Sequence, residues 1–145
     1  MKKNIPFIIF LLIVVILFLI TNFYITEEVS TVIDGDTIKL KDGKIVRLIG
    51  INAPEINENC YKEAREKLKS LVGGKEIRLE KDLTERDSYG RLLRYIFVDD
   101  LFVNSEMIRS GYAKFIEVGN NKKYSDLFLE MENKAKKAKR CIWKN

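Results

Sequence analysis

The chain has 145 residues, no histidine and two cysteines, and it carries 26 basic against 21 acidic side chains. This length suits one modest domain. The lack of histidine excludes Ser–His and Cys–His nucleophilic catalysis and histidine-based zinc sites, and two thiols cannot build a structural zinc site.

The N-terminal segment is set apart by its composition. Two lysines precede residues 5–20, which are all apolar, and residues 23–25 extend the apolar run. Counted through residue 25, the run reaches the roughly 17–25 residues that a membrane span needs, and no small-x-small cleavage site follows it. We predict a transmembrane signal anchor over residues 1–25, which holds a domain of residues 26–145 outside the cell membrane. The alternative is a cleaved signal peptide and a secreted domain.

Five short strands are expected after the anchor. β-Branched residues, apolar alternation and Asp-Gly turns predict strands at residues 31–33, 37–40, 45–51, 75–81 and 92–98. The dipeptide Ala53-Pro54 ends the third strand, because proline donates no backbone hydrogen bond.

Three helices are expected among these strands. Apolar residues at helical spacing predict a helix from Tyr61 to Val72, stopped by a Gly-Gly pair. Asn104 is predicted to cap a short helix that ends before Gly111. A last helix is expected over residues 124–140. Short meandering strands with helices packed on them indicate an α+β domain built on a small barrel rather than a parallel sheet.

The two cysteines, Cys60 and Cys141, could form one disulfide in an exported domain. The bond would tie the start of one helix to the end of another. By closing a long loop it would stabilise the fold by roughly 4 kcal/mol. The alternative is two separate buried thiols.

The C-terminal end of the chain is basic. Residues 134–145 contain six lysines and arginines and no acidic residue, namely Lys134, Lys136, Lys137, Lys139, Arg140 and Lys144. Such a run could attract a polyanion. The alternative is an ordinary solvated helix face.

Oxygen-bearing groups gather at the first turn and at the end of the third strand. Asp34 and Asp36 flank a glycine, and Asn52 and Ala53 close the strand. In a meander these two places can share one rim of the barrel. Carboxylate, amide and backbone carbonyl oxygens are the ligands of a hard cation, so a metal could bind there.

Two arginines and a glutamate complete a possible site. Arg47 lies inside an apolar strand and needs an anion, because an unpaired buried charge is very costly. Arg91 could join it in gripping a phosphate, and Glu55, just past the strand, could take a proton from water. With a metal, these groups would make a phosphodiester-hydrolysis site without histidine. Taken singly, each residue other than Arg47 has an ordinary structural explanation.

At these residues the chain resembles the staphylococcal nuclease (thermonuclease) family. The matching segments occur in order at residues 32–37, 46–55, 87–93, 103–113 and 141–143. The resemblance implies an OB-fold barrel of five strands with three α-helices. It also implies a monomeric, calcium-dependent nuclease that hydrolyses DNA and RNA to 3′-phosphate ends.

The resemblance also assigns roles residue by residue. Arg47 and Arg91 match the arginines that contact the phosphate, and Glu55 matches the general base. The calcium ligands would come from Asp36, Asn52 and the Ala53 carbonyl. Asp87 and Tyr89 occupy positions at which the family has residues near the bound nucleotide.

Some positions depart from the family pattern. Asn52 stands where the best-known member has a second aspartate, so we predict weaker calcium binding, since affinity depends on ligand charge. Ser88 replaces a nucleotide-contacting lysine, and Glu117 and Gly119 replace tyrosines that flank the base. The alternative function is a non-catalytic OB-fold module that binds nucleic acid, which Asn52 favours and the Arg–Glu–Arg set disfavours.

Overall fold

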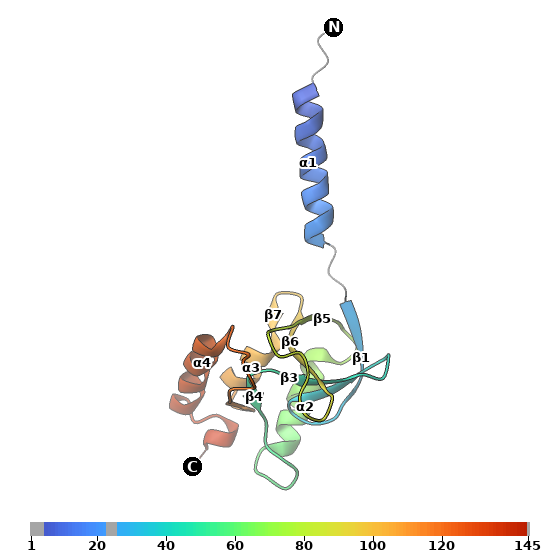
Figure 1. Cartoon of the computed structure of the whole chain (residues 1–145). Helices are drawn as coiled ribbons and strands as arrows, with labels where there is room; N and C mark the ends of the chain where they lie inside the picture. The colour runs from blue at the N-terminus through green and yellow to red at the C-terminus, as the bar shows by residue number, and fades with distance from the viewer. Residues whose placement is uncertain (1–4, 23–25, 145) are drawn as a thin grey trace.

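The computed structural model describes residues 5–22 and 26–144, and it has two parts. Helix α1 (Ile5–Asn22) extends away from a domain that starts at Thr26 (Figure 1). Among the described residues, no helix is both long and apolar enough to cross a membrane. The predicted transmembrane span is therefore not confirmed there. It was counted through Ile25, whereas α1 ends at Asn22, and residues 1–4 and 23–25 lie outside the described part.

The domain is built on a closed barrel of five strands. The strands lie in the order β3-β2-β1-β5-β6, and each neighbouring pair is antiparallel. A parallel pairing between β3 and β6 closes the barrel. The strands are β1 (Thr26–Val32), β2 (Thr37–Leu40), β3 (Ile45–Leu48), β5 (Glu76–Glu80) and β6 (Leu92–Val98). This arrangement confirms the predicted OB-like barrel.

The prediction of a continuous third strand over residues 45–51 is wrong, because the strand is interrupted at Gly50. This glycine has φ of 77°, a left-handed conformation that side chains rarely adopt, and a Cβ there would lie 2.3 Å from the Phe128 ring. Past the break, β4 (Ile51–Asn52) leaves the barrel and pairs with β8 (Lys114–Phe115). The break therefore moves Asn52 out of the barrel wall. A two-residue strand, β7 (Leu101–Phe102), pairs antiparallel with the end of β6.

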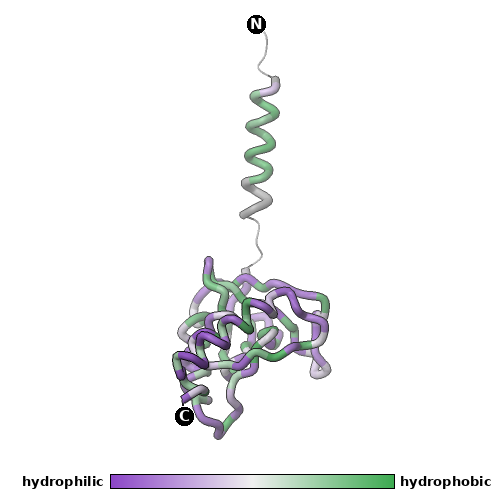
Figure 2. Tube along the Cα trace, turned by 90° about the vertical axis from the view of Figure 1, so that its left-hand side faces the viewer, coloured by the Kyte–Doolittle hydropathy of each residue, from purple (hydrophilic) through white to green (hydrophobic). Residues whose placement is uncertain are grey.

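Three α-helices pack on the barrel in the described part of the domain (Figure 1). They are α2 (Tyr61–Val72), α3 (Val103–Arg109) and α4 (Ser125–Lys137), and a 3₁₀ turn, η1 (Cys141–Trp143), follows. The last helix ends three residues earlier than expected. In Figure 2, hydrophilic and hydrophobic stretches alternate around the domain, as amphipathic elements around a core require.

The predicted role of Asn104 as a helix cap is also wrong. The N-cap of α3 is Phe102, and Asn104 is fully buried inside the helix. Its Oδ1 accepts from the Ile96 backbone N–H at 2.9 Å, and its Nδ2 donates to the Ile49 carbonyl at 2.8 Å. Asn104 therefore satisfies backbone groups that the break at Gly50 leaves outside the strand ladder.

The core lies inside the barrel and under α2, α3 and α4. Ile38, Leu48, Ile77 and Ile96 from four strands are fully buried, and burial of each such side chain stabilises the fold by about 1.5–3 kcal/mol. Phe128 of α4 packs against the same cluster and against Gly50. The long helix thus supports the break in the chain that positions the site.

Cys60 and Cys141 form a disulfide with a Cα–Cα distance of 6.0 Å, the pairing that the sequence leaves open. Cys60 lies at the N-cap of α2, and Cys141 begins η1. The bond joins the segment before α2 to the C-terminal segment.

Candidate active site

The centre of the site is an ion pair between neighbouring strands. Asp36 ends the first turn and Arg47 lies in β3, where it pairs with Thr37 of β2. Arg47 Nε lies 3.0 Å from Asp36 Oδ1, and both residues are less than 10% exposed. The arginine inside the apolar strand thus has the anion that the sequence requires of it.

The rest of the Arg47 guanidinium is held by the chain after β3. Nη1 donates to the carbonyls of Leu48 and Ile51, both at 2.7 Å, and Nη2 donates to Asn52 Oδ1 at 3.1 Å. The turn at Gly50 brings these acceptors around one side chain. Burial lowers the pKa of Arg47, and Asp36 opposes that shift.

The Asp36 carboxylate has further donors and one unfavourable neighbour. Thr37 Oγ1 donates to Oδ1 at 2.9 Å, and the Ala53 N–H donates to Oδ2 at 2.8 Å. Asp34 Oδ1 accepts from the Asp36 N–H at 3.0 Å, which brings a second acid close. Burial raises the pKa of Asp36 to about 6, and the charge of Asp34 adds to the rise, although Arg47 and the hydrogen bond from Ala53 oppose it.

The donor set at this rim fits a hard cation. Burial raises the pKa of Asp36 despite its partners, and a divalent cation beside it would favour the charged carboxylate. In the part of the chain that the structure describes, no three His, Cys, Asp or Glu side chains gather to hold a metal. The remaining ligands would therefore be neutral oxygens, the Asn52 amide and the Ala53 carbonyl. Asn52 Oδ1 already accepts one hydrogen bond from Arg47 and keeps a second lone pair.

A second arginine lies at the same rim. Arg91 precedes β6, whose next residues pair with Val46 and Arg47, and its charge contributes to lowering the pKa of Arg47. Asp87 Oδ2 holds Arg91 Nε at 2.6 Å, while Asp87 Oδ1 accepts from the Tyr89 and Arg91 backbone N–H groups at 3.0 Å. Asp87 thus shapes the turn and orients Arg91. The Tyr89 ring is 84% exposed and lies 5.4 Å from the Arg91 guanidinium.

The structure places Glu55 at the end of the same segment without bringing it into contact with the ion pair. Glu55 follows Pro54 and is exposed. Its N–H donates to Glu58 Oε2 at 2.7 Å, but among the described residues its own carboxylate has no hydrogen bond or ion pair. This carboxylate is therefore open to solvent, two residues after Ala53.

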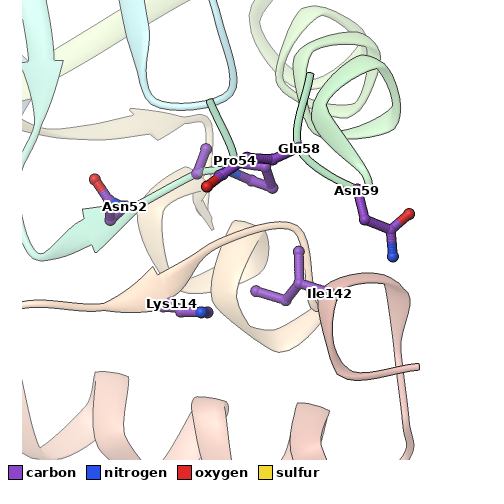
Figure 3. Close-up of a pocket in the computed structure, with 7 residues that line it drawn as sticks. Asn52, Pro54, Glu58, Asn59, Lys114 and Ile142 are labelled. Carbon is purple, nitrogen blue, oxygen red and sulfur yellow. The ribbon is translucent and has the colours of Figure 1, made fainter. Parts of the chain in front are cut away.

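A cleft of about 400 Å³ opens beside residues 52–54 (Figure 3), and Asp36, Arg47, Glu55 and Arg91 are not among its lining residues. Its lining comes from β4, the loop before α2, β8 and η1, and consists of Asn52, Ala53, Pro54, Glu58, Asn59, Lys114 and Ile142. Sequence reasoning missed Glu58, Asn59 and Lys114. Strand β8 has two residues, too few to show an alternating pattern, so nothing nearby in the sequence indicated that Lys114 faces this cleft.

Comparison with known proteins identifies the family of this chain. The family described as staphylococcal nuclease homologue matches residues 45–145, which include Arg47, Glu55 and Arg91. The chain belongs to the staphylococcal nuclease family. The thermonuclease of Staphylococcus hyicus is 36% identical over 129 residues, which cover 83% of this chain and 76% of the relative.

Other members of the family are similar to the chain to a like degree. A protein described as an uncharacterized endonuclease of Escherichia coli is 33% identical over 120 residues, covering 80% of this chain and 75% of the relative. Endonuclease YncB of Bacillus subtilis is 38% identical over 122 residues, covering 77% and 58%. The match therefore spans most of the domain and includes both arginines and the glutamate.

Proposed function

We propose that this chain is a calcium-dependent nuclease that hydrolyses phosphodiester bonds of DNA and RNA and leaves 3′-phosphate ends. Family membership and relatives named thermonuclease and endonuclease support the nuclease activity. The observation that carries the proposal is the rim itself. The buried Asp36–Arg47 pair has Arg91 close by and is hydrogen-bonded to Asn52 and Ala53, the start of the segment that ends in the unpaired Glu55.

The two arginines would contact the phosphate in different ways. A guanidinium has five N–H donors, and four of those on Arg47 are used by Asp36, Leu48, Ile51 and Asn52. One Nη2 donor remains, in a fixed direction. Such a preorganised donor stabilises charge that develops on the phosphate without reorganisation during the reaction.

Arg91 is freer than Arg47. Only its Nε is held, by Asp87, so its two terminal nitrogens remain for a forked pair of hydrogen bonds to phosphate oxygens. Its half-buried position beside the exposed Tyr89 ring suits a group that meets the substrate at the surface. Tyr89 is placed to stack on a base or sugar next to that phosphate.

Glu55 is the proposed general base. A carboxylate that carries no ion pair is free to take a proton from the water that attacks phosphorus. It follows Pro54 and lies two residues after Ala53, whose N–H donates to Asp36. Glu55 therefore stands on the same short segment that completes the charged centre.

Asp36, the Asn52 amide and the Ala53 carbonyl would hold the calcium ion. When bound, the cation supplies positive charge beside the phosphate and so favours the charged transition state. Because Asn52 brings no negative charge, binding should be weaker than with two carboxylates.

We propose further that the domain acts outside the cytosol. The apolar segment of residues 5–20 supports export, and the Cys60–Cys141 disulfide suits an oxidising compartment. Fractionation of cells that express the full chain tests this. We expect nuclease in the medium or the cell envelope, with both cysteines protected from alkylation by the disulfide. Reduced protein confined to the cytosol would contradict export.

The function is tested by incubating the full chain with single-stranded DNA and with RNA, with calcium or with a chelator. We expect calcium-dependent cleavage of both. The 3′ ends of the products should accept no nucleotide label until the 3′-phosphate is removed. Cleavage that persists at full rate in chelator would overturn the calcium requirement. Binding without cleavage under every divalent ion would instead support a nucleic-acid-binding module.

A further inference from the structure

We propose that a basic groove next to the cleft binds the phosphate backbone of the substrate strand beyond the scissile bond. The basic groove is defined by Lys139, Arg140 and Lys144, which follow α4, and by the start of α2 opposite them. The proposal rests on the proposed nuclease function and adds a second contact surface for the same polyanion.

The groove is an open hollow of about 570 Å³ with a basic lining. Four lysines and arginines line it against a single acid, Glu63. Lys67 on its wall is already engaged by Glu106 at 3.4 Å. Within residues 26–144, by contrast, Lys139 and Lys144 have no ion-pair partner, and both are exposed. Their charges are therefore available to a ligand.

The backbone of residues 139–141 has an unusual conformation and is fixed to the rest of the domain. Lys139 and Cys141 have φ of 49° and 33°, in the left-handed region on either side of Arg140. The fold holds the segment by the disulfide to Cys60, by an Ile142 N–H···O bond to Gly111 of 3.1 Å, and by Arg140 Nη1 donating to the Arg109 carbonyl at 3.0 Å. The basic residues thus lie on a fixed segment rather than a free tail.

The basic groove continues the cleft of the site. Asn59 lines both hollows, and the neighbours Cys141 and Ile142 line the groove and the cleft respectively. Figure 3 shows Asn59 and Ile142 at one end of the cleft and Asn52 at the other. A strand whose phosphate sits at the rim can therefore run through the cleft, past the disulfide, to Lys139 and Lys144.

The rest of the basic run differs from the groove in its partners. Lys134 and Lys136 make ion pairs of 2.6 Å with Glu130 and Glu132 one turn earlier in α4. Those two lysines fit the solvated helix face that the sequence left as the alternative. Lys134 is therefore a control for a single lysine of the same basic run, since its removal takes one charge outside the groove, half of what the double variant loses.

The test compares Lys139→Gln/Lys144→Gln with Lys134→Gln in the full chain. The assay measures kcat/KM for a long single-stranded DNA oligonucleotide and for a dinucleotide, across a range of salt concentrations. Each lost phosphate contact should reduce the slope of log K against log salt by about 0.7. We expect the double variant to lose about tenfold in kcat/KM on the long substrate at low salt, with a slope flatter by about 1.4, and to cleave the dinucleotide normally. Lys134→Gln should match wild type on both.

An equal loss of kcat/KM on both substrates, or an unchanged salt slope on the long one, would refute binding of the substrate backbone in the basic groove. The same preparations are titrated with the long oligonucleotide by fluorescence anisotropy. If wild type binds but cleaves nothing, the proposed function fails, and the anisotropy slopes alone then decide on the groove. Equal slopes for wild type and the double variant would refute it.

Discussion

The Asp36 carboxylate and the Arg47 guanidinium form a buried ion pair, with Oδ1 and Nε 3.0 Å apart. The pair belongs both to the barrel, where it joins the first turn to β3, and to the site, where it sets the direction of the remaining Arg47 donor. Stability and the proposed activity therefore depend on the same two residues, whereas the roles proposed for Arg91 and Glu55 belong to more exposed side chains.

Replacing Arg47 should cost stability as well as activity. Arg47→Ala leaves the Asp36 charge buried without its partner and frees two backbone carbonyls, so we expect a loss of about 3–5 kcal/mol in the free energy of unfolding. Arg91→Ala removes a half-buried side chain at a turn and should cost less than about 1 kcal/mol. Urea unfolding of both variants measures this difference. Equal stabilities would show that the Arg47 contacts contribute nothing to the fold.

The stability of the metal-free protein should depend on pH through Asp36. Burial in the folded state raises the pKa of Asp36 to about 6 from its ordinary 3.8. Between these values the folded state holds a proton that the unfolded state has lost, so stability falls as pH rises through this window and levels off above it. The size is on the order of 3 kcal/mol.

Urea unfolding in chelator, from pH 4 to 7, tests this as the difference between wild type and Asp36→Asn. Asp34→Asn should shift the window to lower pH, because the Asp34 charge adds to the rise in the pKa of Asp36. A difference between wild type and Asp36→Asn that stays flat across the range would count against a raised Asp36 pKa.

Asn52→Asp should strengthen calcium binding. The substitution adds a carboxylate beside Asp36, and calcium affinity rises with ligand charge, so a gain of about tenfold or more is expected in calorimetric titration. Asn59→Asp adds the same charge on the cleft lining and serves as the control. Tight calcium binding by wild type that neither change improves would argue against Asn52 as the weak point of the site.

Loss of the disulfide should destabilise the domain. The bond links residues 81 apart in sequence, and opening a loop of that length lowers the free energy of unfolding by roughly 4 kcal/mol. Urea unfolding with and without a dithiol reductant measures the effect, and Cys60→Ser/Cys141→Ser should match the reduced protein and ignore the reductant. Identical curves for reduced and oxidised wild type would contradict it.

Most strands and Arg47 were accessible from the sequence because their signals are local, but β1 runs from Thr26 to Val32 rather than over residues 31–33, and the other candidate site residues depended on the family resemblance. Asp-Gly turns and alternation marked β2 and β6 closely, and an arginine inside an apolar strand marked Arg47. The break at Gly50 was not predictable, since it depends on the Phe128 ring of α4, far along the chain. Asn104 was misread for the same reason. Its partners lie on β6 and beside Gly50 rather than on its own helix.

Glu55 is the residue on which the proposed calcium-dependent hydrolysis depends most. The most direct measurement is the cleavage rate of single-stranded DNA at saturating calcium for wild type, Glu55→Gln and Glu58→Gln. Glu58 is the matched control, because it is an exposed acid on the same loop whose Oε2 accepts from the Glu55 N–H. We predict a loss of about 10²–10⁴-fold for Glu55→Gln and a near wild-type rate for Glu58→Gln. A Glu55→Gln variant that cleaves at the wild-type rate would show that Glu55 is not the general base.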